Sequence, residues 1–209
     1  MPDLERPDRV AVFVDYQNVY ATARTVFHHP SDPPQDGHIW PVRLGELIAG
    51  KRRRLSELHE VRVYRGLPDA TRQPSLYAVN DRQHVAWSGD RRVVTFRRPL
   101  RYPPDWPTSK PQEKGIDVAL AVDLVRLAAQ GAYDVAVVFS RDTDLMPALE
   151  AVRDMRATRV HLEVATWKGA NRLRFSNTNL PWCHLLDETD YRQVQDATDY
   201  LAGRRHGRL

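Results

Sequence analysis

Short apolar runs rich in valine alternate along the chain with longer segments of helical pattern. Each run has about the length of a β-strand and carries β-branched residues, which favour strands. The runs predict strands at residues 9–15, 60–66, 92–98, 133–140 and 159–166. We expect the first and fourth of these strands at the centre of the sheet.

The longer segments between the runs predict helices at residues 42–58, 115–131 and 145–155. Gly131 is a suitable C-terminal cap for the second helix, and Pro147 is tolerated in the first turn of the third. Strands that are almost continuously apolar and alternate with helices indicate a sheet covered on both faces. We therefore predict an α/β fold, a Rossmann-like three-layer α/β/α sandwich with a mostly parallel central sheet.

The length and composition suit one globular domain, because 42% of the 209 residues are hydrophobic. We expect an N-terminal tail at 1–8, a domain at 9–190 and a C-terminal extension at 191–209 whose end is disordered. Two proline-rich stretches, 27–41 and 97–113, interrupt the pattern as irregular insertions. Loops of this length in a compact domain are usually functional or disordered.

The chain has 31 Lys and Arg residues and 27 Asp and Glu residues, so it is mildly basic. This charge balance permits an anionic partner without requiring one. The single cysteine, Cys183, excludes an intramolecular disulfide and a cysteine-based zinc site, and it fits a cytoplasmic location. No apolar stretch is long enough to span a membrane. A homo-oligomer remains possible.

Carboxylates stand out where apolar runs end. Asp15 ends the first strand in "VFVDYQN", with Asn18 about one helical turn further on. A second motif, "EKGIDVALAVD", and a third, "SRDTD", supply the other candidates, which are Lys114, Asp117, Asp123, Ser140, Asp142 and Asp144. Each aspartate alone could simply cap a helix, and Asp123 could belong to a solvent-facing or salt-bridged stripe with Arg126 and Gln130.

The combination of these motifs suggests chemistry. Ligands bind beyond the carboxyl ends of parallel strands, where strand order reverses, so Asp15, Asp117, Asp142 and Asp144 could converge there. Four neighbouring carboxylates repel each other, and a divalent cation removes that repulsion. Oxygen ligands without His or Cys favour Mg²⁺ or Mn²⁺, which suits hydrolysis of a phosphodiester.

The three motifs, in this order, resemble the NYN domain family, relatives of the PIN-domain ribonucleases, and are most similar to its LabA-like bacterial branch. The matching stretches are "VDYQN", "KGIDVALAVDL" and "YDVAVVFSRDTDLMPALEAVR", and the resemblance spans residues 9–187. It implies a PIN-like fold and a metal-dependent endoribonuclease that hydrolyses single-stranded or structured RNA. It further implies that Mg²⁺ or Mn²⁺ is held by Asp15, Asp117, Asp142 and Asp144. Asn18 would orient a ligand or phosphate, and Asp123 is a lower-rank acidic candidate.

A cationic track with aromatic side chains is what single-stranded nucleic acid requires. The stretch that leads into the second motif carries both, including Tyr102 and Trp106. The candidate nucleic-acid contacts are Arg97, Arg98, Arg101, Lys110, Lys114, Ser140 and Arg141. The alternative for the loop is an ordinary basic surface. The "KRRR" run at 51–54 is expected to be a solvated helix face, and His28, His29 and His38 form no recognised metal motif.

Arg141 departs from the family pattern, which usually has Gly at this position. Two roles are open: its cation could lie beside the scissile phosphate, or it could pair with an aspartate and block the metal. The second role would make the protein a catalytically weak or inactive RNA-binding or regulatory module. A haloacid-dehalogenase-like phosphatase is less suitable, because its nucleophilic Asp would follow the strand directly and Ser140 intervenes. A nucleotide-binding Rossmann protein would need a Gly-rich turn, which the first strand lacks.

Overall fold

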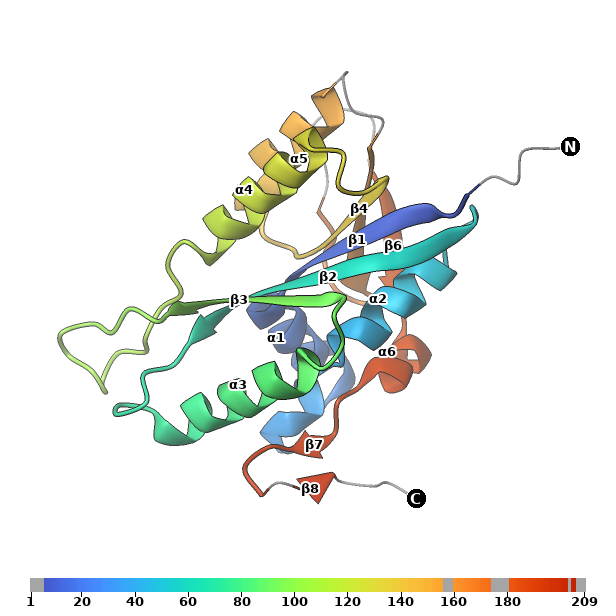
Figure 1. Cartoon of the computed structure of the whole chain (residues 1–209). Coiled ribbons are helices and arrows are strands. Elements are labelled where there is room, and N and C mark those ends of the chain that lie inside the picture. Colours follow the sequence, from blue (N-terminus) through green and yellow to red (C-terminus); the bar gives the residue numbers. More distant parts are fainter. Residues whose placement is uncertain (1–5, 156–159, 174–180, 203, 206–209) are drawn as a thin grey trace, which may run out of the picture.

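A computed structural model describes residues 6–155, 160–173, 181–202 and 204–205 (Figure 1). Its centre is a six-stranded sheet in the order β3-β2-β1-β4-β5-β6, and all five strand pairings are parallel. The strands are β1 (Asp8–Asp15), β2 (Ser56–Leu67), β3 (Val93–Pro99), β4 (Val135–Phe139), β5 (His161–Trp167) and β6 (Trp182–Leu186). The predicted α/β fold with a mostly parallel sheet is confirmed, with β1 and β4 at the centre.

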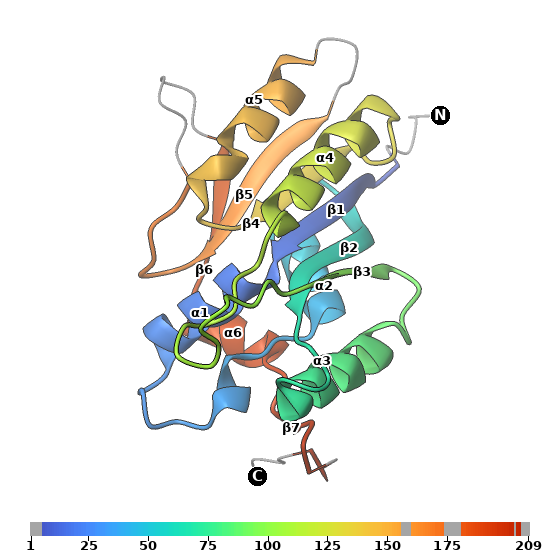
Figure 2. The ribbon, with the colours of Figure 1, turned by 90° about the vertical axis from the view of Figure 1, so that its left-hand side faces the viewer.

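Helices cover both faces of the sheet (Figures 1 and 2). On one face lie α1 (Tyr16–Phe27), α2 (Pro41–Gly50), α3 (Pro74–Trp87) and α6 (Glu188–Val194). On the other lie α4 (Ile116–Ala129) and α5 (Met146–Asp154). Short 3-10 turns, η1 (Pro34–Gly37) and η2 (Thr143–Leu145), precede α2 and α5, and β7 (Thr198–Asp199) pairs with β8 (Arg204–Arg205) near the C-terminus.

The middle of the central strand β1, residues 10–14, is apolar at every position because both of its faces are covered. Val10, Val12 and Val14 belong to the core beneath α1 and α2, while Ala11 and Phe13 belong to the core beneath α4 and α5. All five residues are fully buried. Successive side chains of a strand point to opposite faces, so a strand with two covered faces needs no polar alternation.

The predicted helix at 42–58 is wrong in its second half. The helix α2 ends at Gly50, a residue of low helix propensity, and β2 begins at Ser56 and pairs with β1. The "KRRR" run is therefore a connection at the amino end of the sheet. It is not a uniformly solvated face, because the Arg52 side chain is 6% exposed and pairs with Asp8 at 2.9 Å and Glu163 at 3.0 Å.

The two insertions have ordered contacts of their own. In the first, Ile39 is fully buried and the Trp40 amide donates to the carbonyl of Val194, which attaches the segment to α6. In the second, Arg101 and Gln112 exchange two backbone hydrogen bonds of 2.9 Å, which close the loop that follows β3. Among the described residues, no helix combines the length and the apolarity needed to cross a membrane.

The reversal of strand order lies between β1 and β4. The chain builds β2 and β3 on one side of β1, and it then crosses over to build β4, β5 and β6 on the other. In such sheets the crevice outside the carboxyl ends of the two central strands is the usual ligand position. Asp15 ends β1 there, and Ser140 directly follows β4.

Candidate active site

Asp15 lies at the carboxyl end of β1, where it also caps α1. Its Oδ1 accepts a hydrogen bond of 3.2 Å from the amide of Asn18. The capping interpretation is therefore confirmed, and it does not exclude a second role. A carboxylate has four lone-pair positions, so a capping aspartate retains the capacity to bind a cation.

Ser140 connects the ends of β1 and β4. Its hydroxyl donates to Oδ2 of Asp15 at 2.8 Å, and its Oγ accepts from the amide of Asp142 at 3.0 Å. Asp142 in turn caps η2, because its Oδ1 accepts from the amide of Asp144 at 3.0 Å. A continuous series of hydrogen bonds thus runs through Asp15, Ser140, Asp142 and Asp144. Ser140 is 1% exposed, so water does not compete for these bonds.

Asp117 reaches the same edge from the first turn of α4. The pKa of Asp15 reflects the closeness of Asp117 and Asp142. Burial raises the pKa of Asp15, and the charges of Asp142 and Asp117 raise it further, against the opposing hydrogen bonds from Ser140 and the Asn18 amide. A cation placed among these carboxylates would relieve the repulsion that raises this pKa.

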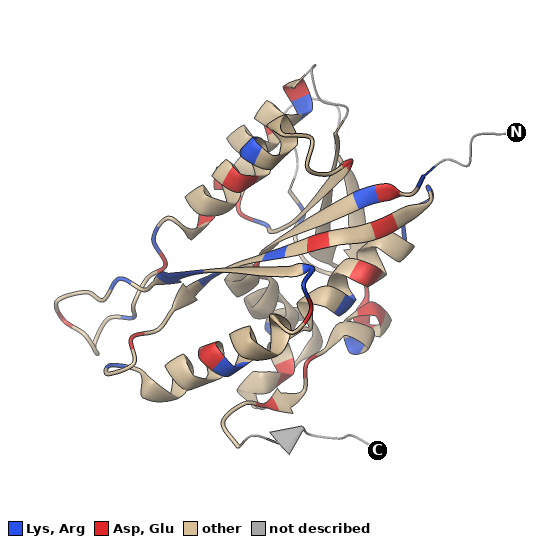
Figure 3. Ribbon diagram, in the orientation of Figure 1, with Lys and Arg blue, Asp and Glu red and all other residues tan. Residues whose placement is uncertain are grey.

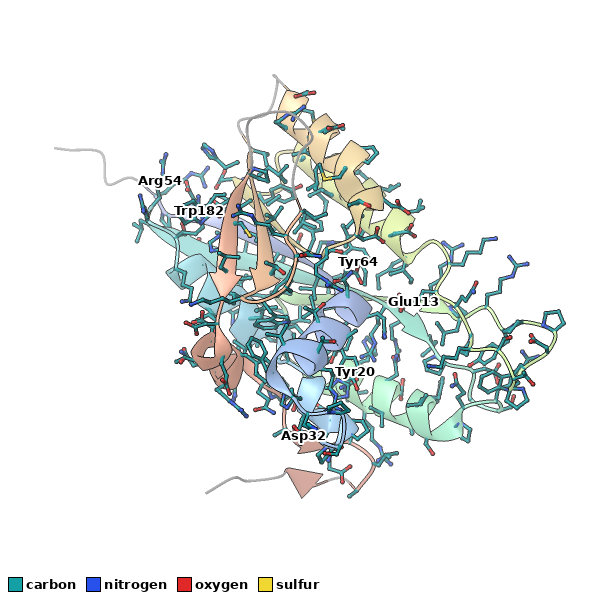
Figure 4. All side chains as sticks on the ribbon, turned by 180° about the vertical axis from the view of Figure 1, so that it is seen from behind. Tyr20, Asp32, Arg54, Tyr64, Glu113 and Trp182 are labelled. Atoms are coloured by element: carbon teal, nitrogen blue, oxygen red, sulfur yellow. The ribbon has the colours of Figure 1, made fainter. Side chains whose placement is uncertain are left out.

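Glu113 is an acidic neighbour that the sequence analysis missed. Its Oε1 accepts a 2.5 Å hydrogen bond from the amide of Gly66, at the carboxyl end of β2. Burial of the carboxyl group raises its pKa, and the charges of Asp15 and Asp117 add to that effect. Figure 4 places Glu113 at the end of the sheet from which the loop after β3 projects. A signal was present in the sequence, since Glu113 stands in the same motif as Asp117.

The donor set of this edge fits a hydrated hard cation. All the donors are oxygens, as Mg²⁺ and Mn²⁺ prefer. No three of these acidic side chains have ligand oxygens all within 4.8 Å of one another in the described structure. Mg²⁺ dehydrates reluctantly and is usually bound through one or two carboxylates and several waters, so this wider spacing suits it.

Arg141 lies on the exposed side of the same edge. Its Nε donates to Oδ1 of Asn18 at 3.3 Å. Within the described part of the chain, Arg141 forms no ion pair with an aspartate of the site. The guanidinium is therefore held by the side-chain oxygen of Asn18. It does not neutralise the charge of the carboxylates.

Asp123 lies further along α4 than Asp117 and belongs to a different network. Its Oδ2 accepts from Arg62 at 2.9 Å and from Tyr64 at 2.8 Å, and its Oδ1 accepts from Arg126 at 2.9 Å. Burial acts to raise the pKa of Asp123, but the bonds from Arg126, Tyr64 and Arg62 lower it overall. This arrangement matches the salt-bridged stripe considered for Asp123, and it occupies both carboxylate oxygens.

The basic residues around the loop have different surroundings. A Cβ added to Gly115 would meet Nη1 of Arg98 at 3.0 Å, so the Arg98 guanidinium lies against the start of α4. Arg97 points to the other face of the sheet and pairs with Asp81 at 3.0 Å. Figure 3 shows further basic positions along the projecting loop. The exposed ones are Arg101, Lys110 and Lys114.

The aromatic residues of the loop pack on each other. The rings of Tyr102 and Trp106 meet edge to face at 5.1 Å. The Tyr102 hydroxyl donates to Gln73 at 2.7 Å and accepts from the amide of Asp69 at 2.9 Å, which attaches the loop to the segment before α3. The loop thus presents an ordered aromatic pair near its exposed basic residues.

An all-parallel sheet with acidic side chains gathered at its strand-order reversal defines an α/β protein with an acidic site at the carboxyl edge. The chain belongs to the NYN domain family, whose model matches residues 9–178. No curated protein matches the chain. Among solved structures, the crystal structure of a Vibrio parahaemolyticus protein of unknown function is similar, at 15% identity and a TM-score of 0.48. That match covers 79% of this chain and 83% of the other.

Proposed function

We propose that this protein is a metal-dependent endoribonuclease that hydrolyses RNA phosphodiester bonds. The observation that supports this most is the convergence of Asp15, Asp117 and Asp142 from three distant parts of the chain at one sheet edge. Partly buried and mutually repelling carboxylates are costly to a fold unless a ligand uses them. A cation-assisted reaction on a phosphate is the use that fits an all-oxygen site in a NYN domain.

The roles follow from the positions of the residues. Asp15, Asp117, Asp142 and Asp144 would hold Mg²⁺ or Mn²⁺, with Glu113 as a neighbouring acceptor. When bound, the metal ion would polarise a phosphoryl oxygen and lower the pKa of a bound water. Ser140 is a positioning residue, because it fixes the Asp15 carboxylate relative to the backbone of Asp142. Asn18 would orient a ligand or phosphate, and it already holds Arg141.

The RNA path that we propose follows the projecting loop towards the carboxylates. Arg98 and Lys114 flank the start of α4 and would contact the phosphates nearest the reaction. Arg101 and Lys110 would contact phosphates further along, with Tyr102 and Trp106 as stacking surfaces. Arg97 contributes less, because Asp81 already neutralises its charge. A cytoplasmic location, with access to RNA, belongs to the same proposal.

The contact between Arg141 and Asn18 favours one second candidate, an RNA-binding module with little or no cleavage. In that case the guanidinium would keep Asn18 from its ligand. The variant Arg141→Gly separates the two candidates. Increased cleavage by this variant would indicate that Arg141 blocks the site, whereas decreased cleavage would indicate that Arg141 assists at the phosphate.

The direct test compares the wild-type protein with Asp15→Asn on end-labelled single-stranded RNA. A DNA of the same sequence is run in parallel, and each assay is repeated with Mg²⁺, with Mn²⁺ and with chelator. We expect the wild type to cleave RNA internally only when metal is present. We expect the variant not to cleave RNA under any of these conditions. Asn is a good helix cap, so α1 should form in both proteins. Equal cleavage by the variant, or cleavage undiminished by chelator, would refute the proposed site.

A further inference from the structure

A second group of ligand atoms lies in the segment between α1 and α2, outside the proposed nuclease site. His28, Asp32 and Asp36 each offer one such atom, and the three atoms all lie within 4.8 Å of one another. The Nδ1 of His28 is 3.5 Å from Oδ2 of Asp32. The sequence alone gave no reason to group these residues, since no metal motif has this spacing.

The imidazole of His28 is fixed in orientation. Its side chain is 4% exposed, its Nε2 makes a 2.9 Å hydrogen bond with the hydroxyl of Tyr191, and the two rings meet edge to face. This contact leaves Nδ1 directed at the carboxylate of Asp32. Metal-binding histidines are commonly held in this way, with the second ring nitrogen bonded to a fixed partner.

Asp36 supplies an independent indication of a ligand. The residue is 8% exposed, and its main-chain carbonyl accepts from the side chain of Gln195 at 3.3 Å. Its carboxylate has no hydrogen-bond or ion-pair partner among the described residues, although it lies beside His28 and Asp32. The carboxylates of Asp36 and Asp32 lie close together, and a cation between them would relieve their mutual repulsion.

The spacing and the support of the group also fit a metal ion. Two ligands about 2.1 Å from Zn²⁺ at a tetrahedral angle lie about 3.4 Å apart, close to the separation of His28 and Asp32. Arg24 donates to the carbonyls of Pro33 and Asp32 at 2.9 Å, and Tyr20 donates to the carbonyl of Pro34 at 2.9 Å. Figure 4 shows Tyr20 and Asp32 close together beside α1. The turn that carries the ligands is thus fixed by main-chain contacts.

We propose that His28, Asp32 and Asp36 form a zinc site, completed by water, that fastens the segment between α1 and α2 to α6 through Tyr191. An imidazole with two carboxylates favours Zn²⁺ over Mg²⁺, because Mg²⁺ selects oxygen ligands. This site is separate from the acidic edge proposed for RNA cleavage, and the proposal does not depend on that function.

The test titrates Zn²⁺ into the full chain after removal of metal, with calorimetry as the readout. The double variant Asp15→Asn, Asp142→Asn removes two carboxylates of the acidic edge and should still bind one Zn²⁺ at this site. Asp36→Asn should weaken binding at this site at least tenfold. Asp32→Asn should do the same, and this residue is more exposed, so its replacement is compatible with folding. His29→Ala is the matched control, and we expect unchanged binding.

A thermal melt accompanies each titration. Zn²⁺ should raise the melting temperature of the wild type and of the double variant, and it should not raise that of the double variant once Asp36→Asn is added to it. Binding that is lost in the double variant would assign the zinc to the acidic edge and overturn the proposal. Binding unaffected by both Asp32→Asn and Asp36→Asn would overturn it as well.

Discussion

Ser140 donates a hydrogen bond to Asp15, from which it is 125 residues distant in sequence. The same oxygen accepts from the amide of Asp142, so one buried hydroxyl joins the two central strands and sets the distance between two acidic side chains. The acidic edge is therefore assembled by bonds of the fold itself, before any ligand is present.

The variant Ser140→Ala should reduce RNA cleavage by about 10- to 100-fold, as is typical when the partner of a metal-binding group is removed. The hydrogen bond from Ser140 lowers the pKa of Asp15, so its loss should also move the acid limb of the pH–rate profile to higher pH. The measurement is cleavage rate against pH at saturating metal. Ser31→Ala, at an exposed position, is the control, and an unshifted acid limb would contradict the positioning role.

The variant Asp15→Asn should stabilise the metal-free protein at neutral pH. The folded-state pKa of Asp15 lies above its ordinary value of 3.8, mainly because of burial, so the folded chain binds this proton more tightly than the unfolded chain. Stability from this group is thus present at low pH and is lost as pH rises from 3.8 through the raised pKa. Asn keeps the shape and the cap without the charge.

Thermal melts at pH 4 and pH 7 provide the measurement. The stabilising effect of Asp15→Asn should be larger at pH 7 than at pH 4, where the wild-type group is partly protonated. Added Mg²⁺ should raise the melting temperature of the wild type more than that of the variant. If the variant is less stable than the wild type at pH 7 without metal, the Asp15 charge does not destabilise the metal-free fold, and the prediction is wrong.

The variant Gly115→Ala should affect both stability and RNA binding. Gly115 has φ of +72°, where alanine costs about 1–2 kcal/mol, and an added Cβ would displace Arg98. Gly131 is a matched control, because its φ is +62° and nothing lies within 4 Å of the added atom. Chemical denaturation should show similar losses for both alanine variants. RNA affinity should fall for Gly115→Ala and for Arg98→Ala, and remain unchanged for Gly131→Ala.

The variant Arg52→Met should destabilise the fold by about 1–3 kcal/mol, since it removes charge-assisted hydrogen bonds to Asp8 and Glu163. Glu163 keeps its 2.7 Å contact with His184, and Asp8 keeps Arg54 at 3.6 Å. Asp8 and Glu163 both lose this partner, and their side chains are only 15% and 12% exposed. Arg53→Met is the matched control, because Arg53 is exposed and stacks on the ring of Trp182, and it should cost less than about 1 kcal/mol. Urea denaturation measures both, and equal losses would contradict the assignment of Arg52 as a structural ion-pair partner.

The sheet could be predicted because its inner strands are buried on both faces and give continuous apolar runs. The edge strand β6 was missed, since Trp182 and Leu185 are 58% and 49% exposed and its pattern is mixed. The helix α3 was missed for a related reason. The residues that it buries include Asn80 and Gln83, so no apolar stripe marks its inner face.

The site could be predicted in part for a topological reason. Asp15 and Asp142 follow strands whose carboxyl ends must meet in a parallel sheet, so their proximity is a consequence of the strand assignment. Glu113 does not follow a strand, so only its place in the motif of Asp117 indicated it, and its position depends on a contact with Gly66 of β2. The approach of Asp36 to His28 likewise depends on the turn η1.

The pairing of β1 with β4 also has a consequence for the protein during its synthesis. Asp15 precedes Asp117 and Asp142 in the sequence, so a growing chain contains the first aspartate before its companions on α4 and after β4 are synthesised. Until then Ser140 is not available to donate its hydrogen bond to Asp15, and the acidic edge cannot assemble. The RNA cleavage that we propose therefore requires that β4 has been synthesised and has paired with β1.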